Sequence, residues 1–234
     1  MKIRDDFSDE RQRGLCAYCG GLTETWDHIP PKAFLDRPLP DALPRIRACE
    51  ECNNGSSPDE QYVACLIECT LAGSSNWEDI KRTNISLTLK RDRRIRSQME
   101  SARQTMLDGS TWFRVEGEGV RAVVLKLARG HAAYELAEPL LEKPESLSAT
   151  SFAQMTAQAR TAFEATPPIS VLPEVGSRAM QLLVVGDSNV NLTQPWIVVQ
   201  PDNYRYLAIV DHTHLIVRLV IREYLAGEVI WRTT

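Results

Sequence analysis

No stretch of this sequence approaches the roughly 20 consecutive apolar residues that cross a bilayer, so we expect no membrane-spanning helix. The first thirteen residues, M-K-I-R-D-D-F-S-D-E-R-Q-R, lack the apolar core of a secretory signal. Internal repeats, coiled-coil heptads and low-complexity tracts are missing as well. These absences predict a globular protein of the cytoplasm that has no membrane partner.

A general excess of positive charge is also lacking, because the formal net charge is -4. The charge is nevertheless uneven: residues 1–75 carry 8 Lys and Arg against 13 Asp and Glu, whereas residues 81–103 carry 8 against 2. A polyanion would therefore meet a local basic segment rather than the whole protein. A solvated helix face without a partner is the alternative interpretation of that segment.

Cysteine is scarce, with six residues in 234, but four of the six form two C-x2-C pairs. In a reducing compartment this spacing predicts metal binding rather than disulfides. Four soft thiolates fill the tetrahedral shell of zinc and leave no open position, so we predict a structural Zn²⁺ site. Its ligands are Cys16, Cys19, Cys49 and Cys52. Cys65 and Cys69 are interpreted as core residues, with a second metal half-site as the alternative.

The order of the elements predicts an α+β protein in three parts. Residues 1–75 contain two short strands, within 22–29 and at 45–48, and a helix from Ser57 to Leu71 with Ser57 as its N-cap. We predict that residues 76–170 are mainly helical, with helices within 77–108, 119–136 and 152–165 and a short strand near 112–115.

The C-terminal part, residues 171–234, is rich in Val, Ile, Leu, Tyr and Trp, which predicts an antiparallel sheet. Its predicted strands are 180–185, 195–200, 204–210 and 214–221, and 223–231 fits either a strand or a short helix. This sheet offers no residue set for chemistry, so recognition, partner docking or formation of a homodimer is the expected role.

The linked motifs C-x2-C…D-H-I-P-P-K…C-x2-C-N-N-G, within residues 16–62, resemble those of the HNH endonuclease family, whose core is the ββα-metal fold. The resemblance implies that His28 is the general base, and that Asp27 and Asn53 hold Mg²⁺ or another divalent ion, with Asn54 as the fallback for Asn53. It also implies one-metal hydrolysis of phosphodiester bonds in nucleic acid, DNA rather than RNA. The resemblance further implies a role in phage defence or in a mobile element, where a partner protein such as an ATPase would activate the nuclease.

The residue types suit that reaction, because imidazole accepts a proton near neutral pH and oxygen ligands suit magnesium. Successive strand residues point to opposite faces, however, so spacing alone does not bring Asp27 and His28 to one phosphate. The chain also departs from the family at Pro44, where an asparagine normally braces the loop. Either Asp41 or backbone groups replace that brace, or the site is weakened. A catalytically inactive treble-clef adaptor for nucleic acid or protein is the alternative function.

The basic segment centres on K-R-D-R-R-I-R, which we predict to contact nucleic-acid phosphates. If the segment forms one helix, Arg91 and Arg94 share one face, and Arg93 and Arg96 share another. The predicted contact residues are Lys90, Arg91, Arg93, Arg94 and Arg96. His131, in an otherwise apolar helical stretch, is interpreted as a packed or capping residue.

Overall fold

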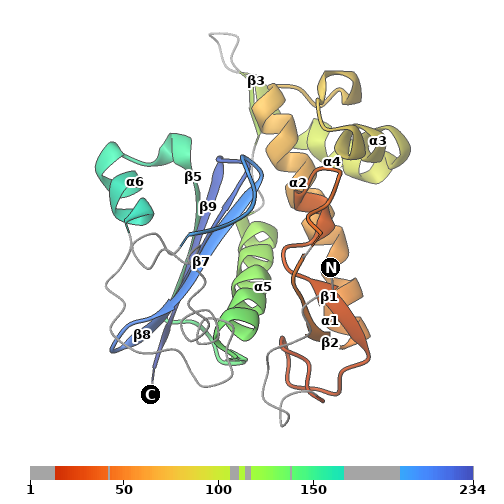
Figure 1. Cartoon of the computed structure of the whole chain (residues 1–234). Helices are drawn as coiled ribbons and strands as arrows, with labels where there is room; N and C mark the ends of the chain where they lie inside the picture. The colour runs from red at the N-terminus through yellow and green to blue at the C-terminus, as the bar shows by residue number, and fades with distance from the viewer. Residues whose placement is uncertain are drawn as a thin grey trace.

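The computed structural model describes residues 14–41, 43–105, 111–113, 117–137, 139–165 and 196–233. It confirms the α+β class. Figure 1 shows helix α5 (Gly117–Leu136) at the centre, between a sheet on one side and the N-terminal hairpin with helix α2 (Ser57–Ala72) on the other. None of the helices in these ranges is long and apolar enough to cross a bilayer.

The N-terminal part is the predicted hairpin followed by a helix. Strands β1 (Thr25–His28) and β2 (Arg45–Ala48) pair antiparallel, with Asp27 opposite Ile46. A single-turn helix η1 (Lys32–Phe34) lies in the loop between them. Helix α1 (Glu50–Gly55) precedes α2, so the helical region begins before the predicted Ser57. The prediction that Ser57 is the N-cap is wrong, because Ser56 precedes α2 and Ser57 lies inside it.

The basic segment forms two helices rather than one. Helix α3 (Thr83–Arg91) ends at Asp92, and α4 (Arg93–Ala102) begins immediately after it. The Asp92 carboxylate accepts hydrogen bonds from the backbone N–H groups of Arg94 and Ile95, which is the geometry of an N-cap. The condition of a single helix on which the shared faces depended is therefore not met, and the arginines lie around a helix–helix junction.

The middle part contributes strands as well as helices. Strands β3 (Arg103–Thr105) and β4 (Thr111–Phe113) pair antiparallel ahead of α5 in the sequence. Strand β5 (Ser146–Ser151), in a region that we predicted to be mainly helical, pairs along the C-terminal sheet. The predicted helix 152–165 is shorter than expected, with a 3-10 turn η3 (Phe152–Gln154) and helix α6 (Ala157–Glu164). A further turn, η2 (Trp77–Asp79), precedes α3.

The sheet is antiparallel throughout and has the strand order β5-β9-β8-β7-β6. Its other strands are β6 (Ile197–Gln200), β7 (Tyr204–Val210), β8 (His214–Ile221) and β9 (Leu225–Arg232). The bounds of β7 and β8 confirm the prediction, and β9 resolves the open choice at 223–231 in favour of a strand. The predicted strand 180–185 lies outside the residues that the structure describes.

Helix α5 lies within the main hydrophobic core, because apolar residues cover most of its circumference. Its predicted apolar face, which includes Val123, Val124 and Leu127, is buried against the sheet and α2. His131 is a packed residue, as predicted: its ring is fully buried, and Nε2 lies 2.7 Å from the hydroxyl of Tyr204. On the opposite face of the sheet, Phe163 of α6 packs with residues of β8 and β9.

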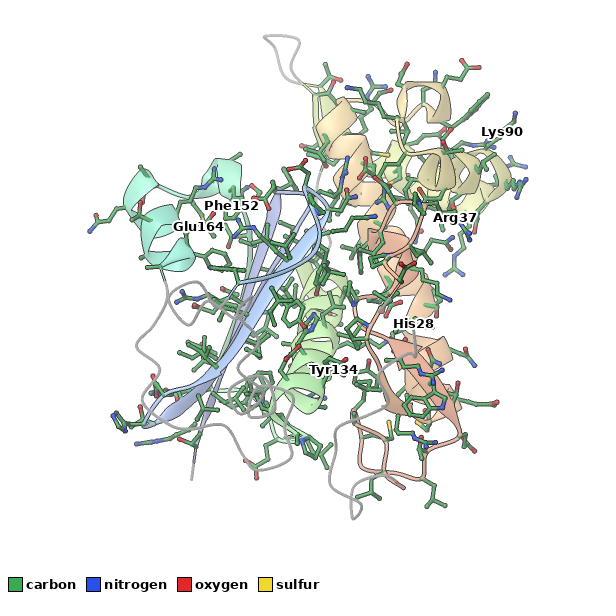
Figure 2. The ribbon with its side chains drawn as sticks, viewed as in Figure 1. His28, Arg37, Lys90, Tyr134, Phe152 and Glu164 are labelled. Atoms are coloured by element: carbon green, nitrogen blue, oxygen red, sulfur yellow. The ribbon has the colours of Figure 1, made fainter. Side chains whose placement is uncertain are left out.

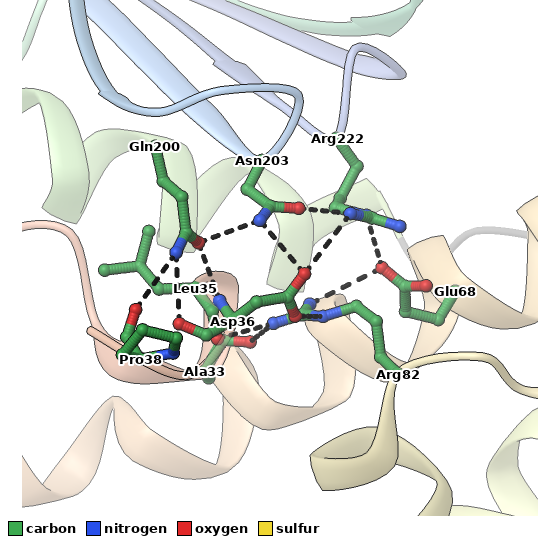
Figure 3. Close-up of polar contacts among 9 residues, drawn as sticks. All are labelled: Ala33, Leu35, Asp36, Pro38, Glu68, Arg82, Gln200, Asn203 and Arg222. Carbon is green, nitrogen blue, oxygen red and sulfur yellow. Dashed lines mark hydrogen bonds and ion pairs between the residues drawn. The ribbon is translucent and has the colours of Figure 1, made fainter. Parts of the chain in front are cut away.

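A polar network ties the N-terminal loop to the sheet, as Figure 3 shows. At its centre the buried guanidinium of Arg82 donates to the Asp36 carboxylate at 2.6 Å and contacts the buried carboxylate of Glu68 at 3.4 Å. Asn203, from the turn between β6 and β7, donates to the other Asp36 oxygen at 3.0 Å. Asp36 thus holds the hairpin loop against the sheet through charge-assisted hydrogen bonds.

Candidate metal centre

The four cysteines of the two C-x2-C pairs come together in one cluster. Their Sγ atoms all lie within 4.8 Å of one another, and the Sγ atoms of Cys19 and Cys49 are 3.8 Å apart. Tetrahedral Zn–S bonds of about 2.3 Å separate neighbouring sulfur atoms by about 3.8 Å, so the geometry fits zinc. The predicted four-cysteine site is confirmed as a cluster that could hold such an ion.

The backbone around the cysteines positions both pairs. Cys16 N–H donates to the carbonyl of Gly21 at 2.7 Å, and Gly20 closes the turn with a φ of 72°, in the left-handed region that favours glycine. Cys49 is the N-cap of α1, and its Sγ accepts a hydrogen bond from the N–H of Cys52 at 3.4 Å. One pair therefore sits on a tight turn and the other on a helix start.

Four ionised thiolates at these distances repel one another. Burial raises the pKa of Cys52, and the neighbouring sulfur atoms of Cys49, Cys19 and Cys16 raise it further. A bound divalent cation would offset this repulsion and keep all four ligands deprotonated. Because four thiolates complete the coordination shell, zinc at this position would be structural. It would join the turn that carries Cys16 and Cys19 to the start of α1.

Asp27, the predicted ligand of a catalytic ion, points into the interior. Its side chain is buried, and its Oδ2 lies 2.7 Å from Nζ of Lys126 and accepts a hydrogen bond from the hydroxyl of Tyr18 at 2.9 Å. The same Nζ lies 2.5 Å from Oε1 of Glu60 on α2. We call these three residues, Asp27, Glu60 and Lys126, the buried triad.

The charges of the triad are coupled. Burial alone would lower the pKa of Lys126, but the carboxylates of Glu60 and Asp27 outweigh it and raise that pKa, so the side chain is an ammonium ion. Burial raises the pKa of Glu60 despite the opposing charge of Lys126. Asp27 therefore already has a cation beside it, held by a helix far away in the sequence.

His28, the predicted general base, lies on the other face of β1. Trp26 and His28 pair across the hairpin with Arg47 and Arg45, so these four side chains share the face that turns away from the core. His28 is half-buried, and its pKa is lowered by burial and then by the charge of Lys32. A neutral imidazole suits a base, but it does not face the carboxylate of Asp27.

Asn53, the predicted second metal ligand, acts as a brace between elements. Its amide donates to the Trp26 carbonyl at 3.2 Å and to the hydroxyl of Thr25 at 3.3 Å, which ties α1 to β1. Asn54, the fallback, is exposed on α1. At the position of the family's bracing asparagine, the Pro44 carbonyl accepts from the Ile29 N–H at 2.9 Å, so a backbone group braces the loop.

The predicted phosphate-contact residues are exposed, except for Arg96, which is half-buried. They flank Asp92 at the junction of α3 and α4, and Lys90 Nζ lies 4.4 Å from the ring centroid of Trp77. Figure 2 shows Lys90 and His28 on the side of the molecule away from the five-stranded sheet. Lys90, Arg91, Arg93 and Arg94 are thus exposed at the junction, and His28 is half-buried on the hairpin.

Two features of this region were not predicted. Trp26 stacks with two guanidinium groups, the Cζ atoms of Arg45 and Arg47 lying 4.6 and 4.0 Å from its ring centroid. The alternation T-W-D-H against R-I-R could have indicated this shared face. Lys126 carried a weaker signal, as a single charge within the apolar run V-V-L-K-L-A.

No family model, curated protein or solved structure matches the chain.

Proposed function

We propose that this chain is a non-catalytic nucleic-acid-binding protein built on a zinc-stapled hairpin–helix module of the HNH type. The observation that carries the proposal is the contact between Lys126 and Asp27, at 2.7 Å. An HNH-type reaction needs the carboxylate of Asp27 on a divalent ion, but here that carboxylate already neutralises an ammonium ion in the interior. The adaptor function therefore fits the contacts of Asp27 better than hydrolysis does.

Nucleic-acid binding is supported by the outer hairpin face, which we define as Trp26, His28, Arg45 and Arg47. Stacking on Trp26 holds both guanidinium groups in place, and pre-organised arginines lose less freedom when they bind phosphate. The partly exposed indole offers a surface on which a base could stack. Phosphate contacts of this kind give affinity and salt dependence without reading sequence.

The basic junction of α3 and α4 supports the same conclusion from a second surface. Four exposed side chains, those of Lys90, Arg91, Arg93 and Arg94, surround a single half-buried carboxylate, that of Asp92. Because the whole chain is acidic, these two surfaces rather than its net charge would attract a polyanion. DNA as the ligand, the partner protein and the homodimer stay predictions.

Binding to a fluorescent duplex, measured by anisotropy across a range of salt concentrations, tests the proposal. We expect the double variant Arg45→Gln, Arg47→Gln to weaken binding at least tenfold and to lower the slope of log affinity against log salt. The matched control is Arg121→Gln, Arg232→Gln, which removes the same charge from two exposed arginines elsewhere. Equal losses for the two double variants would show that binding follows net charge and not the outer hairpin face.

Hydrolysis of phosphodiester bonds is the second candidate, favoured by the position of Asp27, His28 and Asn53 on one hairpin–helix unit beside the four cysteines. A plasmid-nicking assay with Mg²⁺ or Mn²⁺ separates the candidates. We expect no cleavage above background from the wild type. Cleavage that EDTA abolishes and that the His28→Ala variant lacks would overturn the non-catalytic proposal.

A further inference from the structure

The buried triad brings three chain segments to one point. Asp27 comes from β1, Glu60 from α2 and Lys126 from α5, and the side chains of all three are at most 9% exposed. Two carboxylates and one ammonium ion leave a formal excess of one negative charge. Buried charges are retained only where they are paired and hydrogen-bonded, and the hydroxyl of Tyr18 supplies one further donor to Asp27.

Helix α5 closes the inner face of the hairpin tightly, so the ammonium ion is not a loose surface contact. One turn after Lys126, Gly130 faces the hairpin, and a Cβ built on Gly130 would lie 2.6 Å from Cδ1 of Ile29. A residue and the one four positions later lie on the same helix face. The close approach at Gly130 thus holds the stem of Lys126 directed at Asp27 and Glu60.

Two carboxylates around one cation also form the kind of site that binds magnesium. Mg²⁺ and Mn²⁺ take oxygen ligands, and Mg²⁺ commonly binds through one or two carboxylates while waters fill its remaining positions. In the triad a tethered ammonium ion holds that cation position, at 2.7 and 2.5 Å from the two carboxylates. A tethered cation does not have to be recruited from solution, which gives it an advantage over a free ion.

We propose that Lys126 is a built-in replacement for a divalent ion between Asp27 and Glu60, and that this carboxylate pair binds a small, hard divalent cation once the lysine side chain is removed. The proposal rests on the non-catalytic role of Asp27 given above. Its test measures ion binding without nucleic acid, so the two proposals can fail separately.

The test compares Lys126→Ala with Lys126→Met in zinc-loaded protein, with Mn²⁺ as the probe and electron paramagnetic resonance as the readout. Alanine leaves room for an ion with its waters, whereas methionine fills most of the space of the lysine stem without its charge. We expect the alanine variant to bind one Mn²⁺ per chain, at least tenfold more tightly than the wild type or the methionine variant. Mg²⁺ should compete for the site, and the added change Glu60→Gln should abolish it.

Removal of a buried countercharge can also unfold the chain, and that outcome is decisive as well. If Lys126→Ala is unfolded without added metal, Mn²⁺ or Mg²⁺ should restore its far-ultraviolet circular dichroism, because an ion that binds only the folded state stabilises it. The proposal is overturned if the alanine variant binds no more Mn²⁺ than the wild type and gains no structure from it. Binding that survives Glu60→Gln would overturn it equally.

Discussion

Gly130 of α5 lies directly against Ile29 at the end of the first hairpin strand. A Cβ at residue 130 would lie 2.6 Å from Cδ1 and 2.9 Å from Cγ1 of Ile29, and 3.4 Å from Cδ1 of Ile46. Both isoleucines are buried, so neither side chain can swing into solvent to make room. The central helix and the hairpin approach each other at a distance that glycine alone permits without a shift.

We therefore expect Gly130→Ala to destabilise the fold by about 1 kcal/mol, because a mid-range overpacking cost of about 2 kcal/mol exceeds the gain of roughly 1 kcal/mol in helix propensity. Gly119→Ala is the matched control, because Gly119 lies in the same helix and a methyl group added there would meet no atom within 4 Å. That change should be neutral or stabilising by up to about 1 kcal/mol. Urea unfolding of both variants measures the difference, and a Gly130→Ala protein as stable as the wild type would contradict the prediction.

The four-cysteine cluster predicts one zinc ion per chain. Cys19→Ser changes an exposed ligand without leaving a core cavity, so its effect should report the loss of zinc. We expect loss of most of the bound zinc and a destabilisation on the order of 3–5 kcal/mol, a fraction of what structural zinc contributes to small domains. Atomic absorption and thermal unfolding measure the two quantities. Cys69→Ala, a buried thiol outside the cluster, should keep its zinc; loss of zinc there would contradict the assignment.

We expect Asp36 to make the free energy of unfolding depend on pH in the acid range. Burial opposes ionisation of Asp36, but the hydrogen bond and charge of Arg82 outweigh it and lower the pKa below its usual value of 3.8. A lowered pKa in the folded state stabilises the fold above the usual value, and this contribution is lost as the pH falls through the lowered one. Asp36→Asn should therefore be less stable than the wild type at pH 6, by about 1 kcal/mol because the carboxylate is partly exposed.

The difference between the Asp36→Asn and wild-type unfolding free energies should shrink as the pH is lowered below about 4. Denaturant unfolding at a series of pH values measures this change. A difference that stays constant from pH 6 to pH 3 would show that Asp36 acts through its shape and not through its charge. Asp41→Asn, at an exposed position of the same loop, is the control and should show little effect at any pH.

The junction of α3 and α4 predicts the salt dependence of nucleic-acid binding. Replacing Arg91, Arg93, Arg94 and Arg96 by Gln should flatten the slope of log affinity against log salt by about 0.9 for each duplex phosphate that the variant no longer neutralises. Arg96 should contribute least, because it is half-buried and its guanidinium contacts the Lys90 carbonyl at 3.5 Å. Anisotropy titrations measure the slope; an unchanged slope would mean that this segment is only a solvated surface.

Much of the local structure could be read from nearby residues alone. The apolar β-branched and aromatic runs predicted β7 and β8 at their observed bounds, because strand formation follows the local residue pattern there. The cysteine spacing predicted the metal cluster for a similar reason: one pair needs only a tight turn and the other a helix start, and the hairpin between them brings the pairs together. At Asp92 a local signal was present but was missed. Aspartate is a preferred N-cap residue, and the Asp92 side chain accepts hydrogen bonds from the N–H groups of Arg94 and Ile95 in the first turn of α4.

The predicted hydrolytic residues depended on contacts that no local pattern contains. The Asp-His pair in β1 is the same dipeptide whether Asp27 faces solvent, a metal ion or an ammonium ion. Its environment is set by Lys126, which a different helix brings to 2.7 Å, and by the missing side chain at Gly130, which allows that helix to come so close. The environment of Asp27 therefore follows from the packing of α5 on the hairpin and not from its neighbours in the sequence.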